Sequence, residues 1–253
     1  MSSAPVSGRI EELWSADLTG RCGVLQVTAV GRATDGGATV IRIGPESPAS
    51  ETDFFALSVA RARSDAIVTT GSILRAELAV SHDPGPALTE WRGSVLGKTK
   101  QPMLAILTRG TGLPEAHPVF ERPNVLIGTS VESAPELEAR LGPRGVAVVG
   151  LADSSLRGLL RELARRGLPD ICVEAGPSTA GSLYDAPVVV DELLLSVYEE
   201  APLPPALDAG PFLSSAALAE RLGPPVSAVS RREASGLWQF RRFCRSRGRT
   251  RRS

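Results

Sequence analysis

Several residue types are scarce in this sequence, and each scarcity excludes a class of protein. Three cysteines among 253 residues, none in a Cys-x-x-Cys spacing, argue against a disulfide framework and against a structural zinc site. Two histidines and the absence of a Gly-x-Ser-x-Gly motif give no support for a serine hydrolase or a dedicated metal site. Aromatic residues make up only 4% of the chain, so the core has to be built from Ala, Val, Leu and Ile.

Long apolar runs are also missing. No stretch approaches the ~20 residues that cross a membrane, and the start of the chain lacks the apolar segment of a signal peptide. We therefore expect a cytoplasmic protein that does not enter a membrane.

The net charge of zero conceals an asymmetry. Seven of the 28 basic residues lie between Arg241 and the end, where there is no acid, so the rest of the chain carries 21 basic and 28 acidic residues, a net charge of −7. An acidic body is a poor partner for nucleic acid. The sequence therefore predicts no nucleic-acid binding, and a basic end that is solvated and partly disordered.

Short β-rich runs alternate with helical patterns along most of the chain. Helices are predicted after Ser50, with Asp53 three residues on as in a capping box, and over the run 153–167, where Asp153 or Ser154 can cap the start and Gly167 the end. The strands are predicted at Val24–Val30, Ala66–Thr70, Met103–Thr108, Asn124–Gly128, Val146–Gly150, Ile171–Val173 and Glu192–Tyr198. Alternation of this kind favours an α/β domain with a mostly parallel sheet.

The C-terminal part has a different pattern. The run "PVSAVSRRE", the turn "ASG" and the run "LWQFRRF" predict an antiparallel hairpin at the edge of the sheet. Within 81–100, the segment "PALTEWRGSVLG" predicts a short helix in a surface excursion. No linker interrupts 24–243, so one domain is the economical interpretation.

The segment "VEAGPSTAGSLYD", residues 173–185, is the strongest candidate site. A buried strand leads into Glu174, then into small residues and Pro177, which can occupy the first turn of a helix running through Tyr184. Ala175 and Gly176 would let a ligand approach the backbone, and free N–H groups with the hydroxyls of the next residues can bind phosphate oxygens. A capped structural turn would look the same, so the residues alone leave both interpretations open.

Other candidates are weaker. Glu174 either anchors neighbouring backbone amides or faces a ligand at a strand's carboxyl end. The Gly-x-Gly of "RGTGLPE" lacks a third glycine and a following helix, which predicts an ordinary loop. His82 and His117 lie beside proline-rich loops with no evident partner, so neither is expected to be catalytic.

Three segments together resemble the C-terminal reductase domain of bacterial riboflavin biosynthesis, which has a dihydrofolate-reductase-like fold. They are "VEAGPSTAGSLYDAPVVVDELLLSVYEE", which is similar to the family's Glu-Gly-Gly-Pro turn followed by a Val-Asp-Glu-Leu strand; "RSDAIVTTGSILRAE"; and the final hairpin. The resemblance spans about 24–245. It implies a three-layer α/β fold with a mostly parallel central sheet and an antiparallel C-terminal hairpin, an N-terminal extension over 1–23, a reductase domain over 24–245 and a basic tail over 246–253.

The resemblance also implies a function. It implies NADPH as cofactor, hydride transfer to a pyrimidine- or pteridine-like substrate, a homodimer and a substrate contact from Glu174. Thr108 and the "GTS" at 128–130 follow strand ends where a 2′-phosphate could be held, with Arg109 the best candidate by charge. The implied cofactor-binding residues are Gly71, Ser72, Glu77, Arg109, Ala175, Gly176, Pro177, Ser178, Thr179, Ala180 and Gly181.

One family motif is altered. A Ser-x-Asp-Gly-Lys-type motif should follow the first strand, but the chain has "VTAVGRATDGGATVIRIG", where Asp35-Gly36 is the nearest equivalent. No His-x-Glu or Pro-Cys-x-x-Cys motif is present, so the deaminase domain often fused to this reductase is not expected here. A non-catalytic relative that binds a nucleotide or a flavin precursor therefore remains the alternative to a reductase.

Overall fold

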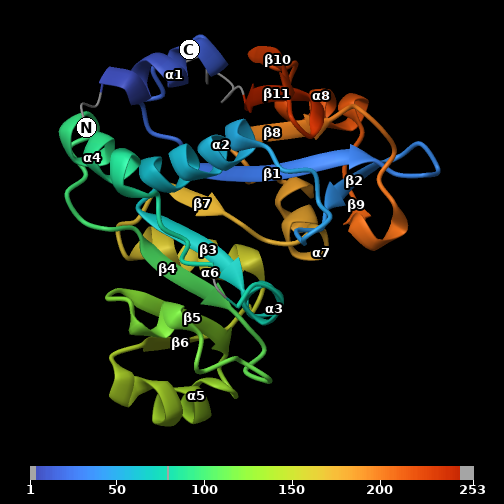
Figure 1. Ribbon diagram of the computed structural model, residues 1–253. Helices are drawn as coiled ribbons and strands as arrows, with labels where there is room; N and C mark the ends of the chain where they lie inside the picture. Colours follow the sequence, from blue (N-terminus) through green and yellow to red (C-terminus); the bar gives the residue numbers. More distant parts are fainter. Residues whose placement is uncertain (1–3, 79, 246–253) are drawn as a thin grey trace, which may run out of the picture.

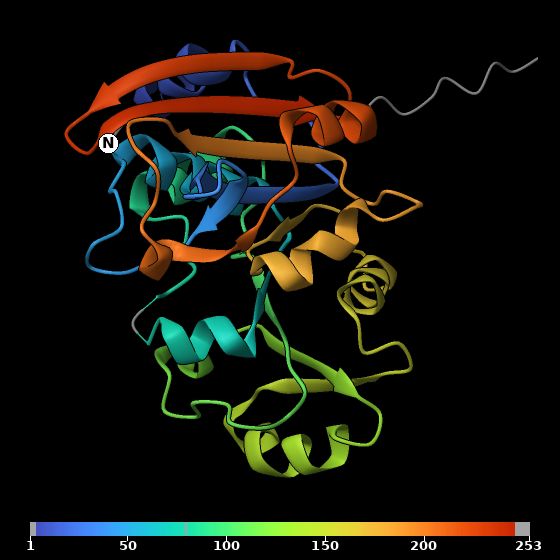
Figure 2. The same ribbon diagram turned by 90° about the vertical axis from the view of Figure 1, so that its right-hand side faces the viewer.

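The computed structural model describes residues 4–78 and 80–245 (Figure 1). Within these residues, eleven strands form one sheet in the order β10-β11-β8-β1-β7-β3-β4-β5-β6, with β2 joining β1 to β9. The strands are β1 (Val24–Arg32), β2 (Ala38–Ile41), β3 (Ala66–Thr70), β4 (Met103–Leu107), β5 (Val125–Ser130), β6 (Ala147–Leu151), β7 (Ile171–Val173), β8 (Glu192–Tyr198), β9 (Asp208–Pro211), β10 (Ser227–Glu233) and β11 (Gly236–Cys244). Figure 2 shows the β10–β11 hairpin at one end of the sheet and β5 and β6 at the other.

Helices cover both faces of this sheet. They are α1 (Ala4–Trp14), α2 (Glu51–Arg63), α3 (Gly71–Ala76), α4 (Pro86–Ser94), α5 (Ala134–Leu141), α6 (Leu156–Arg165), α7 (Pro177–Ala180) and α8 (Ser215–Leu222), with 3₁₀ turns η1 (Pro118–Glu121), η2 (Gly142–Arg144), η3 (Gly181–Tyr184) and η4 (Pro205–Leu207). One apolar cluster joins α1, α2, α4 and α5 to the sheet, and a second joins α6, η3 and α8 to its opposite face. The predicted three-layer α/β fold is confirmed.

The strands form as predicted because continuous apolar runs are buried on both faces of a parallel sheet. All five residues of β3 are buried, and β3 pairs in parallel with β4 and β7. The predicted bounds of β3, β7 and β8 are those observed. The antiparallel hairpin is also confirmed, since β10 pairs with β11 and β11 with β8.

The shortness of β7 shapes the functional edge of the sheet. β7 pairs with β1 only from Val24 to Gln26, whereas β1 continues beside β8 and β2 to Arg32. The chain therefore leaves the sheet at Glu174, whereas the neighbouring strand β1 extends farther. Residues that follow β7 are placed at the carboxyl ends of the parallel strands, where α/β sheets bind ligands.

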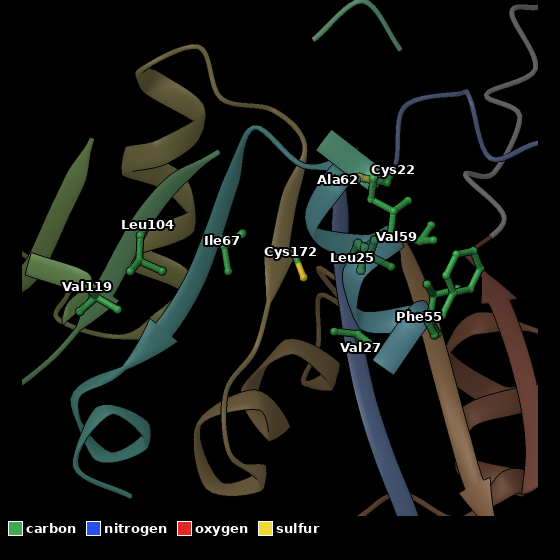
Figure 3. Packing of buried hydrophobic residues seen from close by; sticks show 14 of the residues in the cluster. Cys22, Leu25, Val27, Phe55, Val59, Ala62, Ile67, Leu104, Val119 and Cys172 are labelled. Carbon is green, nitrogen blue, oxygen red and sulfur yellow. The ribbon is translucent and has the colours of Figure 1, made fainter. Parts of the chain in front are cut away.

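Helix α2 packs on this sheet through one apolar side. Figure 3 shows Phe55, Val59 and Ala62 along that side, near Leu25 and Val27 of β1. Two side chains accept hydrogen bonds from the free backbone N–H groups at its N-terminus. The Ser50 hydroxyl accepts from the Asp53 N–H at 2.9 Å, as predicted, and the Glu233 carboxylate of β10 accepts from the N–H groups of Glu51 and Thr52 at 3.0 and 3.3 Å.

One helix is more deeply packed than the sequence suggested. The segment predicted as a surface excursion is α4, but Trp91 is fully buried and its indole N–H donates to the Ser7 hydroxyl at 3.1 Å. The reason is that α1, which lies within the N-terminal extension, covers this part of α4. Ile10 and Leu13 of α1 are buried in the core shared with α2 and α4.

Local details of two other helices also differ. The helix over the run 153–167 is α6, but its cap is Ser155, whose hydroxyl accepts from the Gly158 N–H, rather than Asp153 or Ser154. The helix predicted from Pro177 through Tyr184 is one α-helical turn, α7, continued as the 3₁₀ turn η3.

The basic C-terminal segment begins inside the sheet. Arg242, at the end of β11, bonds Glu192 at 2.7 Å, and Arg245 bonds Asp191 at 2.8 Å. The expected disorder is therefore wrong for 241–245, and the rest of the predicted tail, 246–253, lies outside the described residues. Among the helices of 4–78 and 80–245, none has the length and apolar character needed to cross a bilayer.

Candidate functional site

A cleft of about 810 Å³ opens at the carboxyl ends of the central strands. Its volume is in the range of small-molecule and cofactor sites. Hydroxyl side chains dominate its walls, with two arginines and one carboxylate. The lining residues are Thr70, Gly71, Ser72, Arg75, Leu107, Thr108, Arg109, Thr111, Ser130, Asp153, Ser154, Ser155, Leu156, Ser178, Thr179 and Ser182.

The turn from β3 into α3 forms one wall. Thr70 caps α3 by accepting from the Ile73 N–H at 3.3 Å, and its hydroxyl lies 2.7 Å from that of Ser72. A side chain at position 71 would come within 3.0 Å of the Thr108 hydroxyl and 3.2 Å of Leu113. Gly71 is therefore needed for the close approach of this turn to the end of β4.

The loop after β4 supplies positive charge. Arg109 is exposed at the cleft, and Arg75 of α3 reaches across to the carbonyls of Thr111 and Gly112 at 3.5 and 3.4 Å. Ser130, at the end of β5, lies beside them in the cleft wall. Two guanidinium groups surrounded by hydroxyls form an environment suited to a phosphate.

The segment after β7 forms the opposite wall, and its predicted residues divide into two groups. Ser178 and Thr179 line the cleft, and a side chain added at Gly176 or Gly181 would meet no atom within 4 Å. The remaining three predicted residues face protein: Ala180 is buried in the core, Ala175 packs against that core, and Pro177 lies against Gly210 of β9. Open space over the Gly176 backbone is what a ligand that approaches the main chain requires.

The start of α6 closes the cleft. Ser154 and Ser155 lie in the wall beside Asp153, whose carboxylate pairs with Arg161 at 2.5 Å. The hydrogen bonds to Ser155 and Arg161 lower the pKa of Asp153. Because a guanidinium compensates this carboxylate, the cleft keeps a net preference for anions.

Glu174 lies at the edge of this region in a buried cluster of charged and polar side chains. Arg61 of α2 donates from Nε and Nη2 to its two carboxylate oxygens, both at 2.7 Å, and His82 Nδ1 lies 2.8 Å from Oε2. Burial alone would raise the pKa of Glu174, but Arg61 and His82 outweigh it and lower the pKa to about 2. The carboxylate is therefore ionised and anchored by side chains rather than by the backbone amides that the sequence suggested.

Glu77 lies beside this cluster, at the C-terminus of α3, and is absent from the cleft lining. Burial raises the pKa of Glu77; the nearby His82 lowers it and Glu174 raises it further. Its surroundings are thus those of the Glu174 cluster rather than those of the cleft.

The altered family motif lies at a distance from both features. Asp35 is exposed in the turn between β1 and β2, where its carboxylate accepts from the Gly37 N–H at 2.9 Å. Asp35 therefore stabilises the turn of the β1–β2 hairpin and does not line the cleft. The loop "RGTGLPE" is a loop as predicted, and Arg109 and Thr111 within it line the cleft.

The structure thus brings Gly71, Ser72, Arg109, Ser178 and Thr179 into one cleft. Sequence reasoning missed Arg75 and the hydroxyls at the start of α6, although a run "DSS" before a helix could have indicated them. It also missed Arg61 and the pairing of His82 with Glu174. Because α2 also carries Glu51, Asp53 and Arg63, no local signal set Arg61 apart.

In the class of α/β domains with a mostly parallel sheet, the cleft at the carboxyl ends of the strands is where ligands bind. The chain belongs to one family of that class: a model of the RibD C-terminal domain matches residues 29–198. No curated protein matches the sequence significantly.

Solved structures with the same fold include three with related names. A pyrimidine reductase-like protein from Corynebacterium diphtheriae is 19% identical, with a TM-score of 0.64, over 93% of this chain and 98% of the other. RibD from Acinetobacter baumannii is 18% identical, with a TM-score of 0.59, over 88% of this chain and 58% of the other. A diaminohydroxyphosphoribosylaminopyrimidine deaminase/5-amino-6-(5-phosphoribosylamino)uracil reductase from Thermotoga maritima is 20% identical, with a TM-score of 0.53, over 89% of this chain and 57% of the other. This chain thus spans little more than half the length of the last two.

Proposed function

We propose that the protein is an NADPH-dependent reductase that transfers a hydride to a pyrimidine- or pteridine-like small molecule. The observation that carries the proposal is the cleft, in which Arg75 and Arg109 lie among hydroxyl side chains together with Ser178 and Thr179, which follow the sterically open Gly176. These groups fit a phosphorylated dinucleotide. Membership in the RibD C-terminal domain family supports the same assignment.

Different residues of the site would contact the 2′-phosphate and the pyrophosphate of such a cofactor. Arg109 and Arg75 would bind the 2′-phosphate, because guanidinium groups form charge-assisted bonds with phosphate oxygens. Gly176, Ser178 and Thr179 would accept the pyrophosphate against the backbone, with Gly71 and Ser72 facing them. NADPH supplies a hydride when bound, and the protein supplies orientation and electrostatics.

Glu174 marks where the substrate would lie. It follows β7 and precedes by four residues the cleft residue Ser178, so the cleft and the Glu174 cluster adjoin along the chain. The Arg61 pairing leaves Glu174 ionised, which suits it to orient a donor group of a heterocyclic substrate.

The test is NADPH consumption with 5-amino-6-(5-phosphoribosylamino)uracil and a panel of pterins. We expect loss of NADPH absorbance with a member of this set. Stoichiometric NADPH binding without consumption of NADPH by any of them would contradict the reductase assignment and favour the second candidate.

The second candidate is a non-catalytic relative that binds a nucleotide or a flavin precursor. The placement of Asp35 favours it, because the nearest equivalent of the family's acidic motif lies in an exposed hairpin turn instead of the cleft. Retention of the cleft favours the reductase.

A further inference from the structure

The two histidines of the chain are both buried but differ in their bonding. His117 uses both ring nitrogens: Nδ1 accepts from the Val119 N–H at 3.2 Å, so Nε2 carries the proton and donates to the Glu77 carbonyl at 3.0 Å. His82 uses only Nδ1, toward Glu174, and its buried Nε2 has no hydrogen-bond partner among residues 4–78 and 80–245. The first histidine is bonded as a structural residue, and the second is not.

The partners of His82 fix its tautomer. Glu174 is ionised, so its carboxylate can only accept, and His82 Nδ1 must carry the proton of that bond. Arg61 holds the carboxylate through both oxygens. Nε2 is therefore the one ring atom of His82 that can gain or lose a proton, and its partner Glu174 stabilises the charged ring when it gains one.

The backbone around His82 is also held in an unusual conformation. His82 has φ of 55°, in the left-handed region that non-glycine residues rarely adopt. Arg61 donates to the Asp83 carbonyl at 3.3 Å, and Arg122 bonds both the Ser81 carbonyl and the Asp83 carboxylate. Two arginines thus fix the segment 81–83. His82 thus combines a left-handed backbone with a buried ring nitrogen that makes no hydrogen bond. The unmade hydrogen bond costs about 1–3 kcal/mol, and unfavourable features of this kind are typically concentrated at functional sites.

The cluster lies close to the proposed cofactor cleft. The Glu174 N–H donates to the Val68 carbonyl of β3 at 2.8 Å, and β3 ends at Thr70, which lines the cleft. Glu77, which joins α3 to this region, interacts electrostatically with both His82 and Glu174. A substrate positioned between the cleft and α2 would therefore lie next to the His82 ring.

We propose that His82 is the proton donor of the reductase, with Glu174 and Arg61 as its positioning residues; this rests on the proposed function. Addition of a hydride to the carbon of a C=N bond moves the π electron pair to nitrogen. His82 Nε2–H donates the proton that this nitrogen takes up, and the ring becomes neutral; solvent returns the proton to Nε2 while the segment 81–83 is displaced. Nε2 is closed to solvent, so the substrate must displace part of the segment 81–83, whose Ser81 and Asp83 are exposed.

The electrostatic surroundings of the ring are mixed. Glu174 accepts a hydrogen bond from the ring, and Glu77 of α3 interacts with it electrostatically. The other charged groups nearby are Arg61, Asp83 and Arg122, which bond one another around the loop of His82. Donation requires a proton on Nε2, which a glutamine at position 82 cannot supply.

The experiment compares His82→Gln with the matched control His117→Gln in the full chain. With NADPH and 5-amino-6-(5-phosphoribosylamino)uracil, His82→Gln should lower kcat by about 10²–10⁴. The KM for NADPH should remain within about threefold of wild type. His117→Gln should keep kcat within about threefold of wild type. A folded His82→Gln protein with wild-type kcat overturns the inference while leaving the reductase proposal intact.

A second measurement does not depend on turnover. The ¹⁵N imidazole spectrum should show His82 protonated at Nδ1, and saturation with the same pyrimidine should move its Nε2 resonance while leaving that of His117 in place. A neutral His82 ring whose single proton lies on Nε2, or a resonance that does not move, overturns the inference whether or not the protein consumes NADPH.

Discussion

Arg61 and Glu174, 113 residues apart in the chain, form a two-point ion pair with both N···O distances at 2.7 Å. The pair joins α2 to the carboxyl end of β7, and both side chains are at least nine-tenths buried. Removing one partner of such a pair leaves a buried charge without compensation. It therefore links the stability of the fold to the electrostatics of the candidate site.

The first prediction concerns stability. Glu174→Gln leaves the Arg61 charge buried, and we expect a loss of about 3 kcal/mol in the free energy of unfolding, measured by urea denaturation. The matched control is Glu136→Gln, which removes the exposed pair between Glu136 and Arg140 of α5 and should cost less than about 0.5 kcal/mol. Equal losses in the two variants would contradict the buried role of Glu174.

The second prediction concerns pH. The pKa of Glu174 falls from 4.5 to about 2 on folding, so its carboxylate contributes stability that is present above pH 4.5 and is lost as pH falls toward 2. The difference in unfolding free energy between wild type and Glu174→Gln should therefore be constant near neutrality and shrink over that interval. A difference that is unchanged from pH 7 to about pH 2 is the contrary result.

The sequence predicted those parts of the molecule in which local pattern and burial agree. β3 and β7 are continuous apolar runs in a parallel sheet, and their bounds follow directly. Trp91 was misjudged because burial of an isolated apolar residue depends on partners elsewhere in the chain. The Glu174 cluster was missed for the same reason: Arg61 and His82 lie 113 and 92 residues before their partner, and no short-range spacing reports such a contact.

The third prediction tests the approach to the backbone at Gly176. Its φ of −62° suits any residue and a side chain there meets no atom, so Gly176→Val should fold and yet weaken NADPH binding by about tenfold or more, because its methyl groups occupy the ligand's space. Gly93→Ala in α4, which is also sterically free, should leave affinity unchanged and add about 0.5–1 kcal/mol of stability. Wild-type affinity in a folded Gly176→Val protein would remove this segment from the site.

The fourth prediction concerns selectivity for the phosphorylated cofactor. Arg109→Ala should weaken NADPH binding by about ten- to a hundredfold, the equivalent of one charge-assisted bond, and should change NADH binding little. Arg165→Ala, which removes an exposed arginine of α6 paired with Glu162, serves as the control. Isothermal titration of both cofactors measures the ratio, and equal losses for NADPH and NADH would argue against a 2′-phosphate contact.

The fifth prediction concerns α1. Ile10 is fully buried in the main core, so Ile10→Ala should lower the free energy of unfolding by about 2–5 kcal/mol. Glu11→Ala, at an exposed position of the same helix, should change it by less than about 0.5 kcal/mol. A negligible effect of Ile10→Ala would show that α1 is dispensable for the fold.

The central claim is that the cleft at the carboxyl ends of the strands binds NADPH, and an equilibrium titration that follows cofactor fluorescence tests it most directly. We expect saturable binding of NADPH with a Kd well below about 1 mM, tighter than that of NADH and weakened in Arg109→Ala. Failure of both cofactors to bind at or below that concentration would contradict the assignment of the cleft and the reductase built on it.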